Sequence, residues 1–349
     1  MAPPNRYAWF GLLSIGKAFF LSPMRWRAVA ALSAIIVLLL TLNALNVANS
    51  YVGRNFITAI AVRDRGQYFR FAILYVGVFA ASAITGVSQQ FVQDRLALSW
   101  RDWLTRHLLD RYLSGHTFDR ISAQKDIDNP DQRIAEDVHT FTSTLLSFVV
   151  MITNSVLTTL AFAGVLWSIR PLLLLTAILY AAAGSLFTVL LGYRLVALNS
   201  QQLKKEADLR YGLIHVRERG SRLGERDQPQ EARRIDARLR RVVRNSRAII
   251  GVTRNVGFFT AGYNYLVPIL PIVIVAPLYL RGTIELGVVT QSAMAFAQLL
   301  GAFSLVVAQF QSISAFAAVV RRLSSLWEKM DVTEEGGHQG TARMSDART

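Results

Sequence analysis

Residues 138–169 read VHTFTSTLLSFVVMITNSVLTTLAFAGVLWSI and contain no aspartate, glutamate, lysine or arginine. Five further stretches share this property: 28–53, 71–93, 171–193, 255–280 and 286–320. Each is longer than the ~20 residues that an α-helix needs to cross ~30 Å of hydrocarbon. A soluble bundle built from six such stretches would have almost no surface that water can wet. The sequence therefore predicts an all-α integral membrane protein with six long transmembrane helices.

Composition agrees with this class and excludes others. Hydrophobic residues make up 52% of the 349 residues and charged residues 17%, whereas soluble domains carry roughly a quarter. The chain has no cysteine, so disulfides and thiolate metal sites are excluded. No two of the five histidines have metal-ligand spacing on one helix face. No cluster of polar residues indicates a catalytic site. We therefore expect neither a metal site nor an enzyme, and no cleavable signal peptide.

The net charge of +15 is distributed in a way that predicts topology rather than nucleic-acid binding. The long segments 94–137 and 194–254 are rich in arginine and lysine, whereas the turns at Arg170 and 281–285 carry one arginine each. The positive-inside rule then places both termini and both long loops in the cytoplasm. Segment 54–70, with four arginines, is the exception. We expect a multi-pass protein of a bacterial inner membrane.

The cytoplasmic segments continue the membrane helices. Apolar residues recur at helical spacing through 94–114, and 195–219 also has a helical pattern, so the helices should extend past the bilayer. Residues 1–27 form an expected N-terminal interfacial segment, because aromatic residues surround Lys17 before Pro23. We divide the rest into a six-helix domain, 28–330, and a disordered tail, 331–349.

A near-match to a phosphate-binding loop occurs at Gly11-x4-Gly16-Lys17-Ala18. The Walker A loop ends in Ser or Thr, which binds magnesium, and it follows a buried strand. Here Ala18 takes the final position and the surrounding segment is an aromatic interfacial helix. We expect no nucleotide binding there, and no ATPase within this sequence.

Residues 128–138 read DNPDQRIAEDV. Asn129-Pro130 opens a turn, Pro130 presets the first helical turn, and Asp131 suits the positive end of the helix dipole. Glu136 and Asp137 then lie directly before the third uncharged stretch. A helix start explains the proline and one acid, but not this much charge.

This run resembles a signature of ABC transporter transmembrane domains. It is shared by the peroxisomal (subfamily D) fatty-acyl transporters and the bacterial SbmA/BacA-like peptide transporters. The stretches 96–101, LALSWR, and 49–56, NSYVGRNF, are similar to the same family. The resemblance covers residues 8–330, without a fused nucleotide-binding domain.

The resemblance implies a homodimer of six-helix halves whose cytoplasmic coupling helices rest on ATPase domains. Residues 118–133 would form the first coupling element and 217–230 the second. The second departs from the family pattern, because 219–229 is more basic and contains Pro229. The residues assigned to coupling are Asp128, Asn129, Pro130, Asp131, Gln132, Arg133, Glu136 and Asp137.

Two energy sources compete. A proton-driven carrier, as in the SbmA/BacA-like members, needs an ionisable group at membrane depth, and the six uncharged stretches contain no acidic residue. This favours a permease driven by ATP-Mg on a partner ATPase subunit. The alternatives are a proton-driven peptide importer, and a fragment of a longer fused transporter.

The expected substrate path is lined by uncharged polar side chains. Asn43, Asn46 and Ser50 share a face of the first helix. Gln291, Gln298 and Gln309 share a face of the sixth if 286–320 is one helix. The competing reading is hydrogen bonding between helices. We expect peptides or other bulky amphiphiles as substrates; corrinoid-like and fatty-acyl compounds are alternatives within the family.

Overall fold

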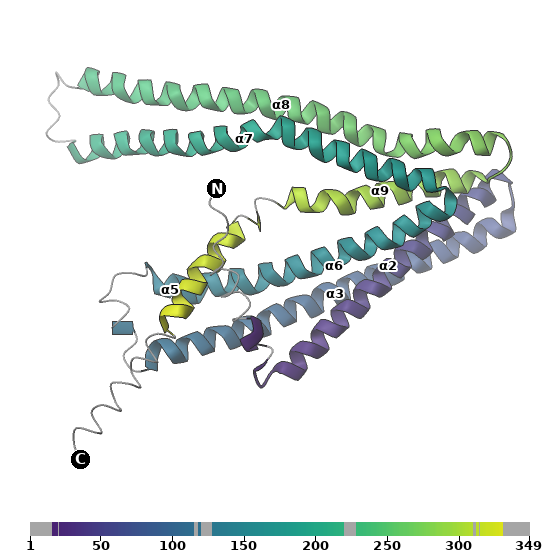
Figure 1. Cartoon of the computed structure of the whole chain (residues 1–349), viewed down its shortest axis with the longest axis horizontal. Coiled ribbons are helices and arrows are strands. Elements are labelled where there is room, and N and C mark those ends of the chain that lie inside the picture. Colours follow the sequence, from purple (N-terminus) through teal and green to yellow (C-terminus); the bar gives the residue numbers. More distant parts are fainter. Residues whose placement is uncertain are drawn as a thin grey trace, which may run out of the picture.

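A computed structural model describes residues 16–19, 21–114, 118–119, 128–219, 228–309, 312–313 and 315–330. This part of the chain is helical and contains no strand. The long helices are α2 (Arg25–Ala61), α3 (Arg65–Leu113), α6 (Val138–Ile169), α7 (Pro171–Arg219), α8 (Gln228–Leu280) and α9 (Leu286–Ala308). Figure 1 shows them as one elongated bundle, and a further unlabelled helix covers 315–330.

Six helices in the described part are long and apolar enough to cross a membrane. This confirms the predicted all-α membrane class. Helices α3, α7 and α8 have 49, 49 and 53 residues. At 1.5 Å per residue they extend about 75–80 Å, more than twice the hydrocarbon thickness. The predicted extension of the helices past the uncharged stretches is therefore confirmed.

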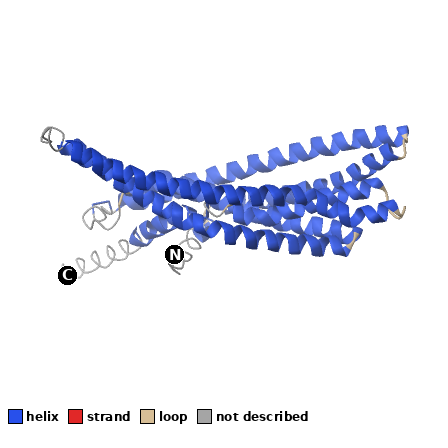
Figure 2. Ribbon diagram, turned by 90° about the horizontal axis from the view of Figure 1, so that it is seen from above, coloured by secondary structure: helices blue, strands red, loops and turns tan. Residues whose placement is uncertain are grey.

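Three short turns lie together at the end of the bundle opposite these extensions (Figures 1 and 2). The first turn bends at Arg63, whose φ is 58°, and the Asp64 side chain accepts a hydrogen bond from the Gln67 N–H, 3.0 Å away, to cap α3. Arg170 alone separates α6 from α7, which starts at Pro171. The third turn uses Gly282, with φ 72°. Local turn chemistry thus fixes the tight connections.

Two apolar cores stabilise the bundle. One lies toward the end where α2 begins, and combines Phe19 with buried residues of α2, α3, α6 and the 315–330 helix. The other joins α6, α7, α8 and α9 near the short turns. Helices α7 and α8 run beside each other and diverge from the other helices toward the ends opposite the short turns (Figure 1). Tyr180 and Tyr263 stack between them, with ring centroids 4.3 Å apart.

The sixth uncharged stretch, 286–320, is not one helix as we expected. Helix α9 ends at Ala308, the chain turns at Gln309, and the next helix covers 315–330. Buried residues of α9 belong to the core near the short turns, whereas Phe316, Leu323 and Leu326 belong to the other core. The chain breaks because the two helices pack against different partners.

Two expectations lie largely outside the described residues. Of the interfacial segment expected at 1–27, only residues 16–19 and 21–27 are described. There Phe19 is buried and stacks on Trp100 of α3, with ring centroids 5.1 Å apart. The predicted tail, 331–349, lies wholly outside the described residues.

Candidate coupling and substrate-path sites

The candidate coupling segment is a helical entry into α6. Asn129 adopts the left-handed conformation, with φ 50° and ψ 63°, and α5 (Pro130–Gln132) follows directly. Pro130 opens the helix and Asp131 lies in its first turn, as predicted. The Asn129 side chain makes no capping hydrogen bond, so its contribution is the backbone turn.

One turn of π-helix, η2 (Arg133–Asp137), joins α5 to α6. A π-turn inserts an extra residue into the helix and is rare outside functional positions. Ile134, within this turn, and Val138, directly after it, are buried in the core. With these two side chains held inside, Arg133 and Asp137 are directed toward the 315–330 helix. The sequence pattern gave no sign of this π-turn.

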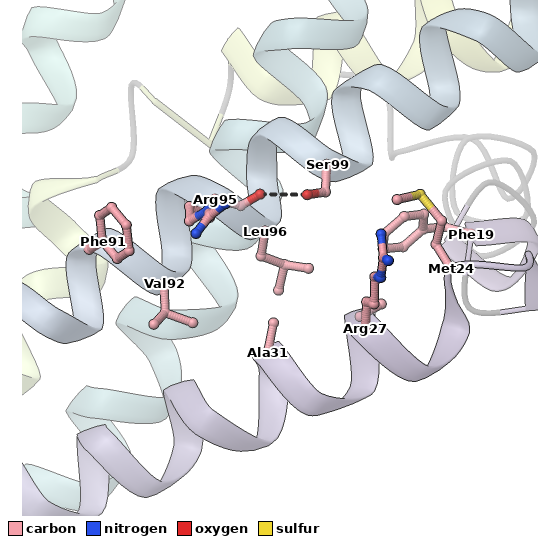
Figure 3. A pocket seen from close by; sticks show the side chains of 10 residues that line it. Phe19, Met24, Arg27, Ala31, Phe91, Val92, Arg95, Leu96 and Ser99 are labelled. Carbon is pink, nitrogen blue, oxygen red and sulfur yellow. Dashed lines mark hydrogen bonds between the residues drawn. The ribbon is translucent and has the colours of Figure 1, made fainter.

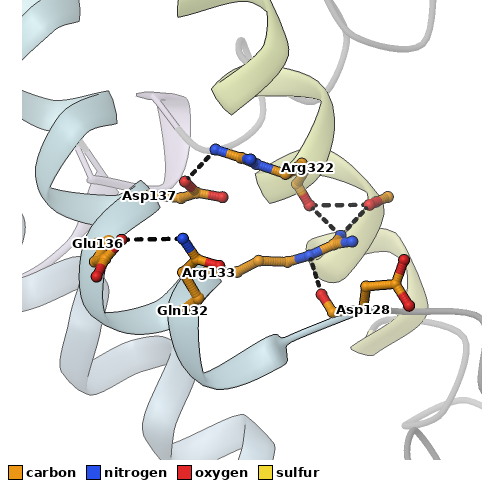
Figure 4. Close-up of polar contacts among 7 residues, drawn as sticks. Asp128, Gln132, Arg133, Glu136, Asp137 and Arg322 are labelled. Atoms are coloured by element: carbon orange, nitrogen blue, oxygen red, sulfur yellow. Dashed lines mark hydrogen bonds and ion pairs between the residues drawn. The ribbon is translucent and has the colours of Figure 1, made fainter. Parts of the chain in front are cut away.

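The Arg133 side chain donates hydrogen bonds to a backbone atom and to a side-chain atom of the 315–330 helix (Figure 4). Its Nη1 donates to the Arg322 carbonyl oxygen at 2.8 Å and to Ser325 Oγ at 2.7 Å. Its Nε donates to the Asp128 carbonyl oxygen at 3.1 Å, closing the turn before the helix. One guanidinium therefore links the start of the segment to a helix whose Arg322 lies 189 positions later in the sequence.

Asp137 adds a second contact, in which the coupling segment supplies the acceptor and the 315–330 helix supplies the arginine. Its Oδ1 lies 2.7 Å from Nη2 of Arg322 (Figure 4). The Asp137 side chain is 5% exposed and that of Arg322 is 49% exposed. Arg133 and Asp137 thus form a reciprocal clamp with Arg322 and Ser325, which we call the 133–322 clamp.

The remaining candidate coupling residues face outward. Asp128, Asn129, Asp131, Gln132 and Glu136 are exposed. Glu136 accepts a hydrogen bond from Gln132 Nε2 at 3.1 Å, and within the described ranges none of the three acids has an ion-pair partner. The predicted set therefore separates into an inward clamp and an outward acidic edge.

Part of each predicted coupling element lies outside the described residues. These parts are 120–127 of the first element and 220–227 of the second, including most of the basic departure at 219–229. The described remainder places 217–218 at the end of α7 and 228–230 at the start of α8.

The 315–330 helix also packs against the part of α3 that extends past the uncharged stretch 71–93. The guanidinium of Arg111 lies 5.3 Å from the Trp327 ring centroid, and His107 lies 5.3 Å from the same ring. Leu323, Leu326 and Met330 are fully buried. The helix therefore bridges α3 and the coupling segment.

Along the candidate substrate path, Asn43 connects two helices. Its Nδ2 donates to Asn154 Oδ1 at 3.0 Å and to the Leu39 carbonyl oxygen at 2.9 Å. Its Oδ1 accepts from Thr158 Oγ1 at 2.9 Å. Asn43 is only 5% exposed, so at this position the reading of hydrogen bonding between helices describes the structure. Asn46, one turn on, is half-buried.

Ser50 and Gln291 lie in a different setting, on the interface of α2 and α9. Ser50 is 2% exposed and Gln291 1%, yet Ser50 Oγ and both polar atoms of Gln291 have no hydrogen-bond partner among the described residues. A Cβ atom added to Gly287 would overlap the Arg54 carbonyl oxygen, so α9 is in close contact with the backbone of α2 there. Ser50 and Gln291 each lie about one helical turn from that contact. Because α2 and α9 are antiparallel, the two residues lie at the same level along the bundle.

The same interface ends in an ion pair near the short turns. Arg54 Nη2 lies 3.7 Å from Glu285 Oε2, which also accepts from Thr58 Oγ1 at 3.2 Å. Asn49 Oδ1 and Arg54 Nε are buried without a partner in the described structure. The α2–α9 interface is therefore polar over several turns, from Asn49 to Thr58.

The predicted face of three glutamines is not formed. Gln291 is buried, Gln298 is exposed, and Gln309 lies in the turn after α9 ends. Spacings of 7 and 11 residues align side chains only on an unbroken helix. Because α9 ends at Ala308, Gln309 is not aligned with the other two.

Sequence reasoning missed several polar residues that complete these arrangements. Arg322 and Ser325 follow the last uncharged stretch, and the sequence around them does not indicate that they contact residues near position 130. Asn154 and Thr158 stand at i and i+4 in α6, a spacing that places both on one helix face. That spacing was the one signal available beforehand.

Comparison with known proteins gives the family. The sequence model described as ABC transporter transmembrane region 2 matches residues 15–280. The chain is 38% identical over 327 residues to ABC transporter D family member 2, chloroplastic, of Arabidopsis thaliana, covering 93% of this chain and 46% of the relative. It is 35% identical over 334 residues to an uncharacterized ABC transporter ATP-binding protein of Synechocystis, covering 93% and 50%.

A more distant relative is the inner membrane ABC transporter ATP-binding protein YddA of Escherichia coli, 23% identical over 357 residues, with 96% of this chain and 64% of the relative covered. The chain spans about half the length of the first two relatives. Six apolar helices in the described structure and the family match over most of the chain agree with each other. The chain belongs to the ABC transporter transmembrane region 2 family and is the membrane half of an ABC transporter.

Proposed function

We propose that this chain is the permease of an ATP-driven transporter, and that the coupling segment 128–137 transmits the work of a nucleotide-binding domain located outside these 349 residues. The observation that carries the proposal is the 133–322 clamp. It joins the start of α6 to the 315–330 helix through hydrogen bonds and an ion pair of 2.7–2.8 Å.

The outward acidic edge supplies the docking side of this mechanism. Asp128, Asp131 and Glu136 are exposed and form no salt bridge within the described chain, and of the three only Asp128 interacts electrostatically with Arg133. A basic partner surface is therefore their natural complement. A push on this edge moves α5 and η2. The clamp then passes the displacement to the 315–330 helix, and Ile134 and Val138 pass it to the core.

The ionisable groups near the membrane support ATP as the energy source. Asp137 is paired with Arg322 and Glu285 with Arg54, while Asp94 accepts a hydrogen bond from Gln90 at 2.9 Å. A proton-driven carrier needs a carboxylate that changes charge at membrane depth. The paired carboxylates at the ends of the spans are poor candidates for that role.

A homodimer is part of the proposal, because α7 presents apolar side chains beyond the membrane. Leu203, Tyr211 and Leu213 are 70%, 66% and 51% exposed. They lie 10–20 residues past Tyr193, the end of the uncharged stretch, and hence about 15–30 Å outside the hydrocarbon. Apolar residues at that depth face water unless a second copy covers them.

The proposed substrates are peptides or other bulky amphiphiles. The polar groups at the α2–α9 interface are mostly uncharged, which suits amide-rich or amphiphilic solutes better than small ions. Ser50 and Gln291 have unused hydrogen-bonding capacity there. The loop charges support a topology with both termini cytoplasmic. The likeness to an inner membrane transporter of Escherichia coli supports a bacterial inner membrane.

Co-purification from the native host tests the proposal. The full chain, isolated with the nucleotide-binding protein or domain that accompanies it, should hydrolyse ATP faster when a transported peptide is added. Arg133→Ala should lower this stimulation while the complex remains assembled. Isolation of the intact chain with no nucleotide-binding polypeptide, attached or associated, would contradict the proposal.

A further inference from the structure

An apolar cavity of about 260 Å³ lies between α2 and α3 near the end where α2 begins. Its walls include Phe19, Ala28, Ala31, Val92 and Leu96. Figure 3 shows Ala31 and Leu96 facing each other across it. Apolar cavities of roughly 150 Å³ already admit a benzene-sized molecule. This cavity therefore accepts a segment of hydrocarbon chain.

Two arginines stand at the cavity. Arg27 extends from α2 toward α3 at the end nearer Phe19, and Arg95 lies beside Phe91 at the other end (Figure 3). The Arg95 guanidinium carbon is 5.6 Å from the Phe91 ring centroid. Neither arginine has an acidic partner among the described residues, since neighbouring Asp94 is hydrogen-bonded to Gln90. The cavity therefore combines an apolar interior with two positive charges that form no salt bridge in the described part of the chain.

The cavity lies at a membrane surface. Arg27 directly precedes the uncharged stretch 28–53, and Arg95 follows the stretch 71–93 after Asp94. Trp26 is 74% exposed beside them, as expected for the aromatic belt at an interface. Arginine at this depth reaches lipid phosphates while its stem stays against apolar surface.

We propose that this cavity binds an anionic phospholipid of the leaflet that contacts the start of α2, with an acyl segment between Ala31 and Leu96 and a headgroup attracted by the positive charges of Arg27 and Arg95. The proposal commits to a lipid rather than a soluble anion because most of the cavity wall is apolar. It also goes beyond the transport function, and it stands whichever energy source drives the protein. On the proposed topology this leaflet is the cytoplasmic one, where anionic lipids attract basic groups.

The test titrates the full chain in detergent with phosphatidylglycerol and with phosphatidylcholine of the same acyl chains, and counts bound lipid by native mass spectrometry. The double variant Arg27→Gln/Arg95→Gln should bind phosphatidylglycerol more weakly by about fivefold for each arginine. Arg25→Gln/Arg101→Gln removes the same charge outside the cavity and should leave binding unchanged. Ala31→Phe, which fills the apolar part, should weaken lipid binding without any change of charge.

Three outcomes would overturn the proposal. The first is equal affinity of the wild-type chain for both lipids. The second is an equal loss in the two double variants, which would mean attraction by overall surface charge. The third is displacement of phosphatidylglycerol by an equal concentration of glycerol 3-phosphate, which would mean a site for a soluble phosphate. Arg27→Lys/Arg95→Lys keeps the charge and should retain most of the preference, so a folding defect is distinguishable from a lost site.

Discussion

The Arg322 guanidinium lies 2.7 Å from the Asp137 carboxylate, and this contact ties the last described helix to the first turn of α6. The residues are 185 positions apart, and the carboxylate is almost wholly buried. A buried charge that loses its partner is costly. Asp137 therefore makes the position of the 315–330 helix important for the stability of the end of the bundle opposite the short turns.

Replacing Arg322 by Gln should destabilise the protein by about 1–2 kcal/mol, less than for a fully buried pair because half of the arginine side chain is exposed. Asp137→Asn/Arg322→Gln should recover part of the loss, since no unpaired charge remains. Thermal unfolding of the two single variants and the double variant in one detergent measures this coupling. Strictly additive losses would show that the ion pair contributes nothing.

Asn43→Ala should destabilise the contact between α2 and α6 by roughly 1–2 kcal/mol, because it removes bonds to Asn154 and Thr158 and leaves both partners unpaired. Asn46→Ala, one turn away with no such bonds, is the matched control and should leave the unfolding temperature unchanged. If Asn43→Ala altered only substrate affinity and left stability intact, Asn43 would belong to the path instead.

Gln291→Met should maintain or raise the unfolding temperature. The two polar atoms of Gln291 are buried without partners, and such groups cost roughly 1–3 kcal/mol. Substrate-stimulated ATP hydrolysis should fall in the same variant if the substrate supplies the missing hydrogen bonds. A stable variant with undiminished stimulation would remove Gln291 from the substrate path.

Gly287→Ala should separate α2 from α9, because the added methyl group meets the Arg54 carbonyl oxygen and Thr58 Oγ1. Overpacking of this kind costs about 1–3 kcal/mol. Gly301→Ala, on the same helix, has no atom near its added methyl and should be neutral or slightly stabilising. Equal unfolding temperatures for the two variants would contradict the close contact.

The membrane class was predictable because missing charges are a local property of each stretch. The helix that contains α6 ends at Ile169, where the uncharged stretch also ends, since Arg170 follows it. No charged residue stands at the end of α9, because the uncharged stretch continues to residue 320. Residues 305–315 contain neither proline nor glycine, and the break is set by the separate cores that the two helices join.

The site was predictable to a smaller extent. Pro130 and Asp131 have local reasons for their positions, whereas the partners of Arg133 and Asp137 are set by tertiary packing. Polar spacing along a helix likewise indicates which residues share a face. It does not distinguish Asn43, bonded to a neighbouring helix, from Gln291, buried without a partner.

The most direct test of the central claim is transport of a labelled peptide by membrane vesicles from the native host, prepared in both orientations. We expect movement that requires ATP, persists with a protonophore, and is lost in Arg133→Ala at unchanged protein level. Movement that continues without ATP and collapses with the protonophore would contradict an ATP-driven permease and would favour the proton-driven alternative.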